Sequence, residues 1–268
     1  MNLKLQRQLG PLATAGLLTL ASAAHAAEGQ PGNDVAQANN PLANASAFNV
    51  HNYYIGEVTG TNEPGNQFWL RFAKPFSIGE TNWLMRASLP ILTYPVPPEF
   101  DHKTGLGDFN AFAAYLVDVG NPAVSFGVGP LISAPTATDD PLGTGKWSAG
   151  LVNILFNATS PTFMYGYLLT WQASFAGERD RANVNVAAFQ PLLIYQLGGG
   201  TYLRSTPIMT YDFANDTYSV PLGLGIGQVW KSDKTVYNLF LEPQVSVADK
   251  GVGWPKWQIF VGLNMVFK

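Results

Sequence analysis

The strand signal is clearest in residues 257–268, which read WQIFVGLNMVFK. The odd positions of this stretch are all large and apolar, whereas the even positions mix amides, a glycine, a lysine and two apolar side chains. Successive side chains of a β-strand point to opposite faces, so the alternation predicts a strand with one wholly apolar face. Such a strand would separate an apolar environment from a mixed one.

The same alternation recurs along the chain, for instance in residues 82–91, 163–175 and 235–247. Almost no run from residue 47 onward has helical spacing, so the predicted class is all-β. The candidate strands are bounded by Gly, Pro, Asn or Asp and begin near residues 47, 66, 81, 107, 123, 146, 163, 183, 201, 218, 235 and 257.

The predicted connections alternate in length. Those after every second strand are tight, as at Gly79-Glu80 and Gly198-Gly199-Gly200, and the others are mostly longer, the largest running from Tyr94 to Leu106. Further long loops are expected at 135–145 and 248–256. An even number of strands with this layout predicts a transmembrane antiparallel up-and-down β-barrel of about 12 strands, with both termini periplasmic.

Composition agrees with a membrane barrel. Only 12% of the 268 residues are charged, whereas a soluble domain carries about 25%. The chain has no Cys, which excludes a disulfide scaffold, a thiolate metal site and a Cys nucleophile. The net charge is −3 and Lys and Arg form no cluster, so a nucleic-acid partner is not expected.

Aromatic residues gather near the ends of the predicted strands. Aromatic rings favour the membrane interface, where an apolar body and a wet edge are both satisfied. One set flanks the tight turns and includes Phe76, Trp83, Tyr115, Phe126, Trp230 and Tyr237. The other set lies near the long loops and includes Phe68, Tyr94, Trp147, Phe175, Tyr211 and Trp257.

The N-terminus divides into two predicted segments before the barrel at 46–268. Residues 1–26 combine basic residues, an apolar stretch at 12–23 and a small-residue site, which predicts a signal peptide cleaved after Ala26 and export to the outer membrane. No later window approaches the ~20 apolar residues of a membrane helix. Residues 27–45 are a flexible periplasmic leader or, alternatively, a plug that folds into the lumen.

The even face of the strands predicts what lines the lumen. A barrel of about 12 strands lies between the filled small barrels and the open porins, so we expect a narrow, partly filled lumen. Its charges form either a pore filter or a structural ion-pair network. The predicted pore-lining residues are Arg71, Arg86, Arg204, Gln172, Asn238, Glu242, Gln244, Gln258 and Asn264. In residues 218–230, Gln228 shares the parity of Leu222 and Ile226, which predicts a bulge or a position at the wet rim.

Catalytic and metal chemistry find little support. Only His51 and His102 remain after signal removal, without an evident Ser partner for a hydrolase or a ligand set for a metal. The loop carboxylates Asp139, Asp140 and Glu178 are interpreted as solvated. We therefore expect no enzyme activity, no metal and no cofactor. A lipid-modifying enzyme centred on His102 remains the alternative.

The chain resembles the outer-membrane proteins of the meta-pathway phenol-degradation family. The resembling stretches include NPLAN at 40–44, GLGD at 105–108 and SAPTATDD at 133–140, with 196–207 and 221–231. These are strand, turn and rim motifs, so the resemblance implies a channel for small, often hydrophobic compounds without assigning binding residues. Gly262, Met265 and Phe267 resemble the signal read by the barrel-assembly machinery, although Lys268 follows the aromatic.

Together these observations predict an outer-membrane channel for a small solute, aromatic or otherwise hydrophobic. Its expected partners are outer-membrane lipids, the assembly machinery and that solute. The alternative from another class is a non-conducting structural or surface-binding barrel.

Overall fold

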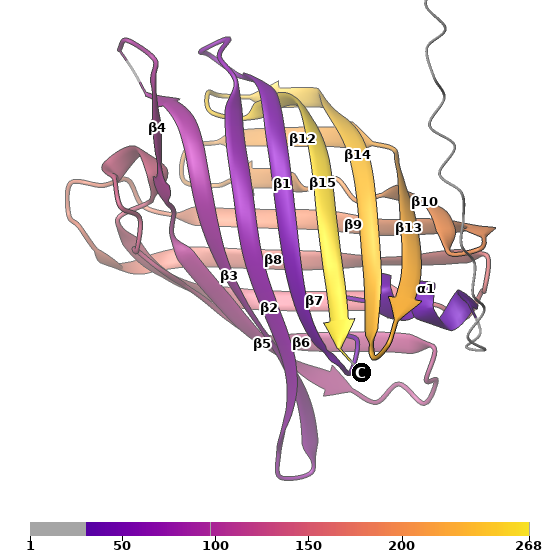
Figure 1. The fold of residues 1–268 in the computed structure, drawn as a ribbon. Helices are drawn as coiled ribbons and strands as arrows, with labels where there is room; N and C mark the ends of the chain where they lie inside the picture. Colours follow the sequence, from indigo (N-terminus) through magenta and orange to yellow (C-terminus); the bar gives the residue numbers. More distant parts are fainter. Residues whose placement is uncertain (1–30, 97, 268) are drawn as a thin grey trace, which may run out of the picture.

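The computed structural model describes residues 31–96 and 98–267, and the predicted signal peptide and its cleavage site lie outside them. The described part is almost entirely β (Figure 1). None of its helices is long and apolar enough to span a membrane. Its elements are α1 (Pro31–Asn39), β1 (Ser46–Val58), β2 (Gly65–Ile78), β3 (Thr81–Val96), β4 (Asp101–Leu106), β5 (Phe109–Val117), β6 (Val124–Ala134), the 3-10 helix η1 (Asp140–Leu142), β7 (Lys146–Asn157), β8 (Phe163–Gly177), β9 (Asn185–Gly198), β10 (Thr201–Ser205), β11 (Met209–Asp212), β12 (Thr217–Gly223), β13 (Gly225–Ser232), β14 (Thr235–Lys250) and β15 (Pro255–Phe267).

The strands close into a barrel. Every pairing is antiparallel between neighbours in sequence, and β1 closes the ring by pairing with β15 from Ser46–Phe267 onward. Three barrel strands are each interrupted, as β4 and β5, β10 and β11, and β12 and β13, so the 15 segments form 12 strands. Closure gives every membrane-embedded backbone group a partner. The predicted all-β, antiparallel barrel of about 12 strands is confirmed.

Two predicted long loops are wrong in extent. The stretch 94–106 is mostly a hairpin, because β3 continues to Val96 and pairs with β4 from Asp101. The stretch 248–256 is shortened in the same way, since β14 runs to Lys250 and β15 starts at Pro255. These extensions carry polar residues on both faces because they rise beyond the apolar layer, so they lack the alternation that marks a membrane strand.

The interruptions have local causes. Asp108, between β4 and β5, accepts hydrogen bonds from the backbone of Ala137 and Thr144 and so ties down the loop at 135–145. At the break before β13, Leu224 donates its backbone N–H to Pro243. Outward parity is kept through this break.

Gln228 lies at the periplasmic rim. Its amide donates to the backbone oxygen of Gly199 in the turn between β9 and β10, and its oxygen accepts from the hydroxyl of Thr201. Of the two alternatives for this residue, the rim position is the one that the structure supports.

The outer face is apolar and ends in aromatic contacts. Leucines such as Leu151 and Leu239 are exposed on it. Rings stack near the tight turns, as between Trp230 and Tyr237, whose centroids are 5.4 Å apart. At the opposite end, Tyr54 meets Trp257 edge-on. This is the surface that a bilayer requires of a barrel.

Helix α1 packs against the inward face of the barrel near the C-terminus (Figure 1). Val35 and Ala38 are buried in a cluster with apolar side chains of β7–β10 and β13–β15. Leu42, just after the helix, is buried in a second cluster with residues of β3, β5, β7 and β8. The described residues 31–45, which we call the plug segment, thus pack inside the barrel, and that they close the lumen stays a prediction.

Candidate functional site: the lumen

A buried ion pair lies in the middle of the lumen. Arg204 Nε donates to Glu242 Oε2 over 2.8 Å, and Glu242 is completely buried. The carboxylate also accepts hydrogen bonds from the backbone N–H and the hydroxyl of Thr206 and from the amide of Gln244. The guanidinium stacks on Phe240, its Cζ 3.5 Å from the ring centroid. Both charges are thus held by a closed set of partners.

This ion pair explains the interruption between β10 and β11. The N–H of Thr206 bonds Glu242 inside the barrel instead of continuing the ladder. Pro207 follows and has no N–H to give. The ladder resumes only at Met209.

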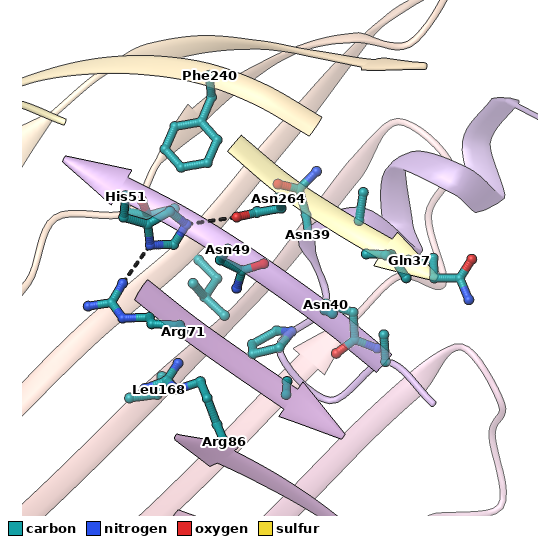
Figure 2. Close-up of a pocket in the computed structure, with 18 of the residues that line it drawn as sticks. Gln37, Asn39, Asn40, Asn49, His51, Arg71, Arg86, Leu168, Phe240 and Asn264 are labelled. Carbon is teal, nitrogen blue, oxygen red and sulfur yellow. Dashed lines mark hydrogen bonds between the residues drawn. The ribbon is translucent and has the colours of Figure 1, made fainter. Parts of the chain in front are cut away.

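A second polar group joins β1, β2 and β15 (Figure 2). Arg71 Nη1 lies 2.5 Å from His51 Nδ1, and His51 Nε2 lies 2.7 Å from Asn264 Oδ1. Arginine can only donate, so His51 Nδ1 is an acceptor and its proton is on Nε2, from which it donates to Asn264. The histidine is therefore held neutral between the two.

Arg86 on β3 has no carboxylate or hydrogen-bond partner among the described residues. Its Cζ lies 4.5 Å from the centroid of the Phe112 ring, and its Nε is buried without a partner. Arg71, which bonds His51, also has no carboxylate partner among the described residues; its Nε is likewise unpartnered, and its Cζ lies 4.7 Å from the Trp69 ring centroid.

The predicted polar residues do not form one site. Gln172 accepts a hydrogen bond from Ser133 on another strand. Asn238 is completely buried, accepts from the hydroxyl of Tyr202 and donates to the backbone oxygen of Ala38 in α1. Asn238 therefore fastens the helix, whereas Gln172 belongs to the opposite half of the lumen.

Gln244 and Gln258 lie toward the long loops. Gln258 donates to Gln244 over 2.6 Å, and Gln244 in turn donates to Glu242. The amides thus extend the ion-pair network outward. Both glutamines line a cavity on the long-loop side of the ion pair.

Three cavities follow one another along the lumen. The outer cavity has a volume of about 180 Å³ and is lined by Gln67, Trp69, Tyr94, Gln244 and Gln258. The central cavity has a volume of about 120 Å³ and lies among His51, Arg71, Arg86, Arg204, Asn264 and residues 37–41 (Figure 2). The inner cavity, of about 590 Å³, lies between residues 36–44 and the tight-turn ends of β5–β7.

Sequence reasoning missed two contributors to this region. The sequence offers His51 as a candidate only for catalysis or metal binding, yet the odd positions of 47–55 all face inward, and that parity places it in the lumen. The helix had no signal, because its residues are polar and small with no apolar periodicity.

The three residues of the predicted assembly signal lie on β15. Met265 and Phe267 face outward, and Phe267 is exposed. Gly262 faces inward, where a Cβ would overlap the ring of Phe240 and approach His51. Packing therefore requires this glycine independently of any role in assembly.

Two alternatives from the sequence remain to be placed: an enzyme site at His102 and a metal site on loop carboxylates. His102 lies on β4, and its Nε2 is 3.0 Å from the backbone oxygen of Pro64. In the described part of the chain, no group of three or more His, Cys, Asp or Glu residues is arranged to hold a metal ion.

The closed antiparallel barrel, the apolar outer face and the polar lumen define an outer-membrane β-barrel protein. No protein-family model and no curated protein matches the sequence. Solved structures of the same fold exist. The COG4313 outer membrane channel from Pseudomonas putida F1 is similar over 85% of this chain and 98% of its own, with 12% identity and a TM-score of 0.64.

Two porins are also similar in fold. The NanC porin aligns with 82% of this chain and 99% of its own at 9% identity and a TM-score of 0.52. The KdgM porin in complex with disordered oligogalacturonate aligns with 83% and 99% at 8% identity and a TM-score of 0.51. At such identities the similarity establishes the barrel architecture.

Proposed function

We propose that the protein is an outer-membrane channel for small solutes, amphipathic or aromatic in character. The observation that carries this proposal is that the three lumen cavities share walls. Tyr53 and Arg71 line both the outer and the central cavity. Gln37, Asn40 and Ala43 line both the central and the inner cavity. A solute would pass two constrictions, one made by barrel strands and one by the segment after α1.

The mixed lining suits such a solute. The central cavity combines guanidinium groups and amides with aromatic and leucine side chains. Ligand sites for small organic molecules are mostly apolar with a few placed polar groups. The similarity in fold to proteins described as channels and porins is in keeping with this role.

The test is single-channel conductance of the refolded mature protein in a planar bilayer, with and without residues 27–45. We expect discrete conductance steps, with larger steps in the shortened form because its inner constriction is gone. Folding of both forms is checked by heat-modifiable migration on a gel. Silence from both folded forms would contradict the proposal.

Ion selectivity provides a second readout. Arg71 and Arg86 carry charges that no carboxylate among the described residues neutralises. We expect the channel to favour anions. In a salt gradient, the double variant Arg71→Ala and Arg86→Ala should shift the reversal potential toward the value of a cation-selective channel. An unchanged reversal potential would mean that the two arginines do not border the ion path.

A non-conducting structural barrel is the second candidate. What favours it is the filled periplasmic half, where α1 and two apolar clusters occupy the lumen. The same conductance experiment separates the two, because a structural barrel is silent even when residues 27–45 are removed.

We further propose that the chain is not an enzyme and that its partners are outer-membrane lipids, the barrel-assembly machinery and the solute. In support of the first point, the His102 ring contacts a backbone carbonyl, not a hydroxyl nucleophile. Release of fatty acid from phospholipid vesicles by the refolded protein, abolished by His102→Ala, would overturn it.

A further inference from the structure

The charges of the lumen do not balance within the barrel. Arg71, Arg86, Arg204 and Glu242 form a charged belt in the lumen, in which Glu242 is the acidic member. Arg204, Thr206 and Gln244 use both of its oxygens. His51 is neutral, as its hydrogen bonds require. Arg71 and Arg86 therefore leave two positive charges at the central cavity without a carboxylate among the described residues.

The two arginines are neighbours in the sheet. Arg71 lies opposite Ser88 on β3, and Arg86 lies opposite Ala73 on β2, so they form a diagonal pair. Residues in this relation are about 7–8 Å apart in an antiparallel sheet, within reach of long side chains. Two like charges on such neighbouring side chains repel each other, and an anion bound between them would offset that repulsion.

Their guanidinium groups have unused donors. Trp69 and Phe112 contact the faces of the two groups, whereas the N–H donors lie in the guanidinium plane. Arg71 gives one donor to His51 and also interacts with the hydroxyl of Tyr53, whereas Arg86 gives none to the described residues. The Nε atoms of both are buried without a partner and are not accessible from the cavity, so a ligand would meet the terminal N–H groups. In-plane donors of this kind match the two oxygens of a carboxylate.

The cavity also has apolar lining. Leu84, Leu168 and Leu192 line it together with the arginines, and Figure 2 labels Leu168 with Arg71 and Arg86 among the lining residues. The volume of about 120 Å³ is of the order of the ~150 Å³ apolar cavity that accommodates benzene. The body of a fitting ligand is thus about one ring in size.

We propose that Arg71 and Arg86 bind the carboxylate of a small amphipathic monocarboxylic acid, whose apolar body packs on Leu84, Leu168 and Leu192. This inference rests on the proposed channel function and names the class of solute. The paired guanidinium groups select the carboxylate, and the leucines select a compact apolar body. The central cavity is then a solute-binding site between the two constrictions.

The test is isothermal titration calorimetry of the full mature chain in lipid nanodiscs, with benzoate as the probe. We expect saturable binding that weakens about tenfold or more in Arg71→Gln and in Arg86→Gln, since each removes a charge-assisted hydrogen bond. Arg179→Gln is the matched control, because Arg179 is exposed in the turn after β8; its affinity should equal that of the unchanged protein.

Competitors separate the ligand classes. Benzyl alcohol, which has the ring without the charge, and inorganic phosphate, which has charge without the ring, should each displace benzoate poorly. Displacement by either at concentrations similar to benzoate would overturn the proposal, as would the absence of saturable benzoate binding to folded protein or unchanged affinity in Arg86→Gln.

Arg86→Lys tests the proposal even if the glutamine variants fail to fold. It keeps the charge but loses the planar fork, so benzoate binding should weaken while the barrel folds normally. Unchanged affinity in this variant would exclude a positioned guanidinium. Conductance of the same preparation is measured in parallel: conductance without benzoate binding rejects the site and keeps the channel, whereas binding without conductance rejects the channel.

Discussion

The periplasmic and extracellular halves of the lumen use opposite means of filling the same barrel. Toward the tight turns, α1 and Leu42 pack on valine, leucine, isoleucine and aromatic side chains. Toward the long loops, the wall consists of amides, hydroxyls and rings around an open cavity. The belt of Arg71, Arg86, Arg204 and Glu242 lies between the halves.

The difference teaches how one closed sheet can combine a tightly packed region with open space. Apolar packing in the periplasmic half is strong and non-directional, and it holds α1 and the segment after it, which are not part of the closed sheet. Directional hydrogen bonds in the extracellular half keep side chains against the wall and leave space. The predictions that follow act on this contrast, beginning with the belt where the halves meet.

The largest effect is expected from Glu242→Ala. It leaves Arg204 buried without its carboxylate and Thr206 and Gln244 without an acceptor, so the free energy of unfolding should fall by about 3–5 kcal/mol. Urea unfolding of the refolded barrel in lipid vesicles measures this loss.

The matched control is Glu57→Ala, which removes a pair with Lys256 at the rim. That pair spans 3.4 Å between two partly exposed side chains, and exposed pairs contribute about 0–1 kcal/mol. Equal losses in both variants would show that the lumen pair has no special weight.

The second effect concerns the plug. Leu42→Ala removes a buried side chain from the cluster that holds the segment after α1, which should weaken its docking by about 2–5 kcal/mol. Channel steps should then approach those of the form lacking residues 27–45. Leu151→Ala, the same substitution on the outer face where the leucine is exposed, should leave the steps unchanged. An unchanged Leu42→Ala channel would mean that the plug is held elsewhere.

A smaller loss is expected in the extracellular half from Gln258→Leu. It removes the donor to Gln244 and leaves a buried acceptor unpaired, at a cost of about 1–3 kcal/mol. Urea unfolding again measures the change. A gain in stability would indicate that the polar wall is maintained for passage of solute and not for the fold.

The smallest effect lies at the outer rim, where Lys250 Nζ donates to Asp216 over 2.5 Å and Tyr211 donates to the same carboxylate. These hydrogen bonds, that from Lys250 first, lower the pKa of Asp216 below its usual 3.8, and Asp216 raises the pKa of Lys250.

The contribution of Asp216 to stability is therefore complete above pH 3.8 and is lost as the pH falls through the lowered value. Because the groups are exposed, Asp216→Asn should change the unfolding midpoint at neutral pH only slightly and abolish the difference between neutral and strongly acidic pH at this site. A large change at neutral pH would contradict a solvent-exposed contact.

Much of the architecture followed from the sequence. Alternation in 257–268 is dictated by the two environments of a membrane strand, and the same parity put Arg71, Arg204 and Asn264 on the inward face. It was lost where strands leave the membrane, as at Asp101–Leu106, because both faces there meet water and neither needs apolar residues.

By itself, then, the sequence determined the barrel, its strand number and the side to which residues of the membrane-spanning strands point, since lipid outside and polar groups inside impose a period of two. Only the tertiary structure decided which inward residues meet. Glu242 could have neutralised any of the three arginines, and the registers of β13 with β10 and with β14, which place Gly225 between the two side chains, gave it to Arg204. Closure of the ring likewise created the apolar pocket for α1, whose own residues carry no periodic signal because nine residues held on several sides need no single apolar face.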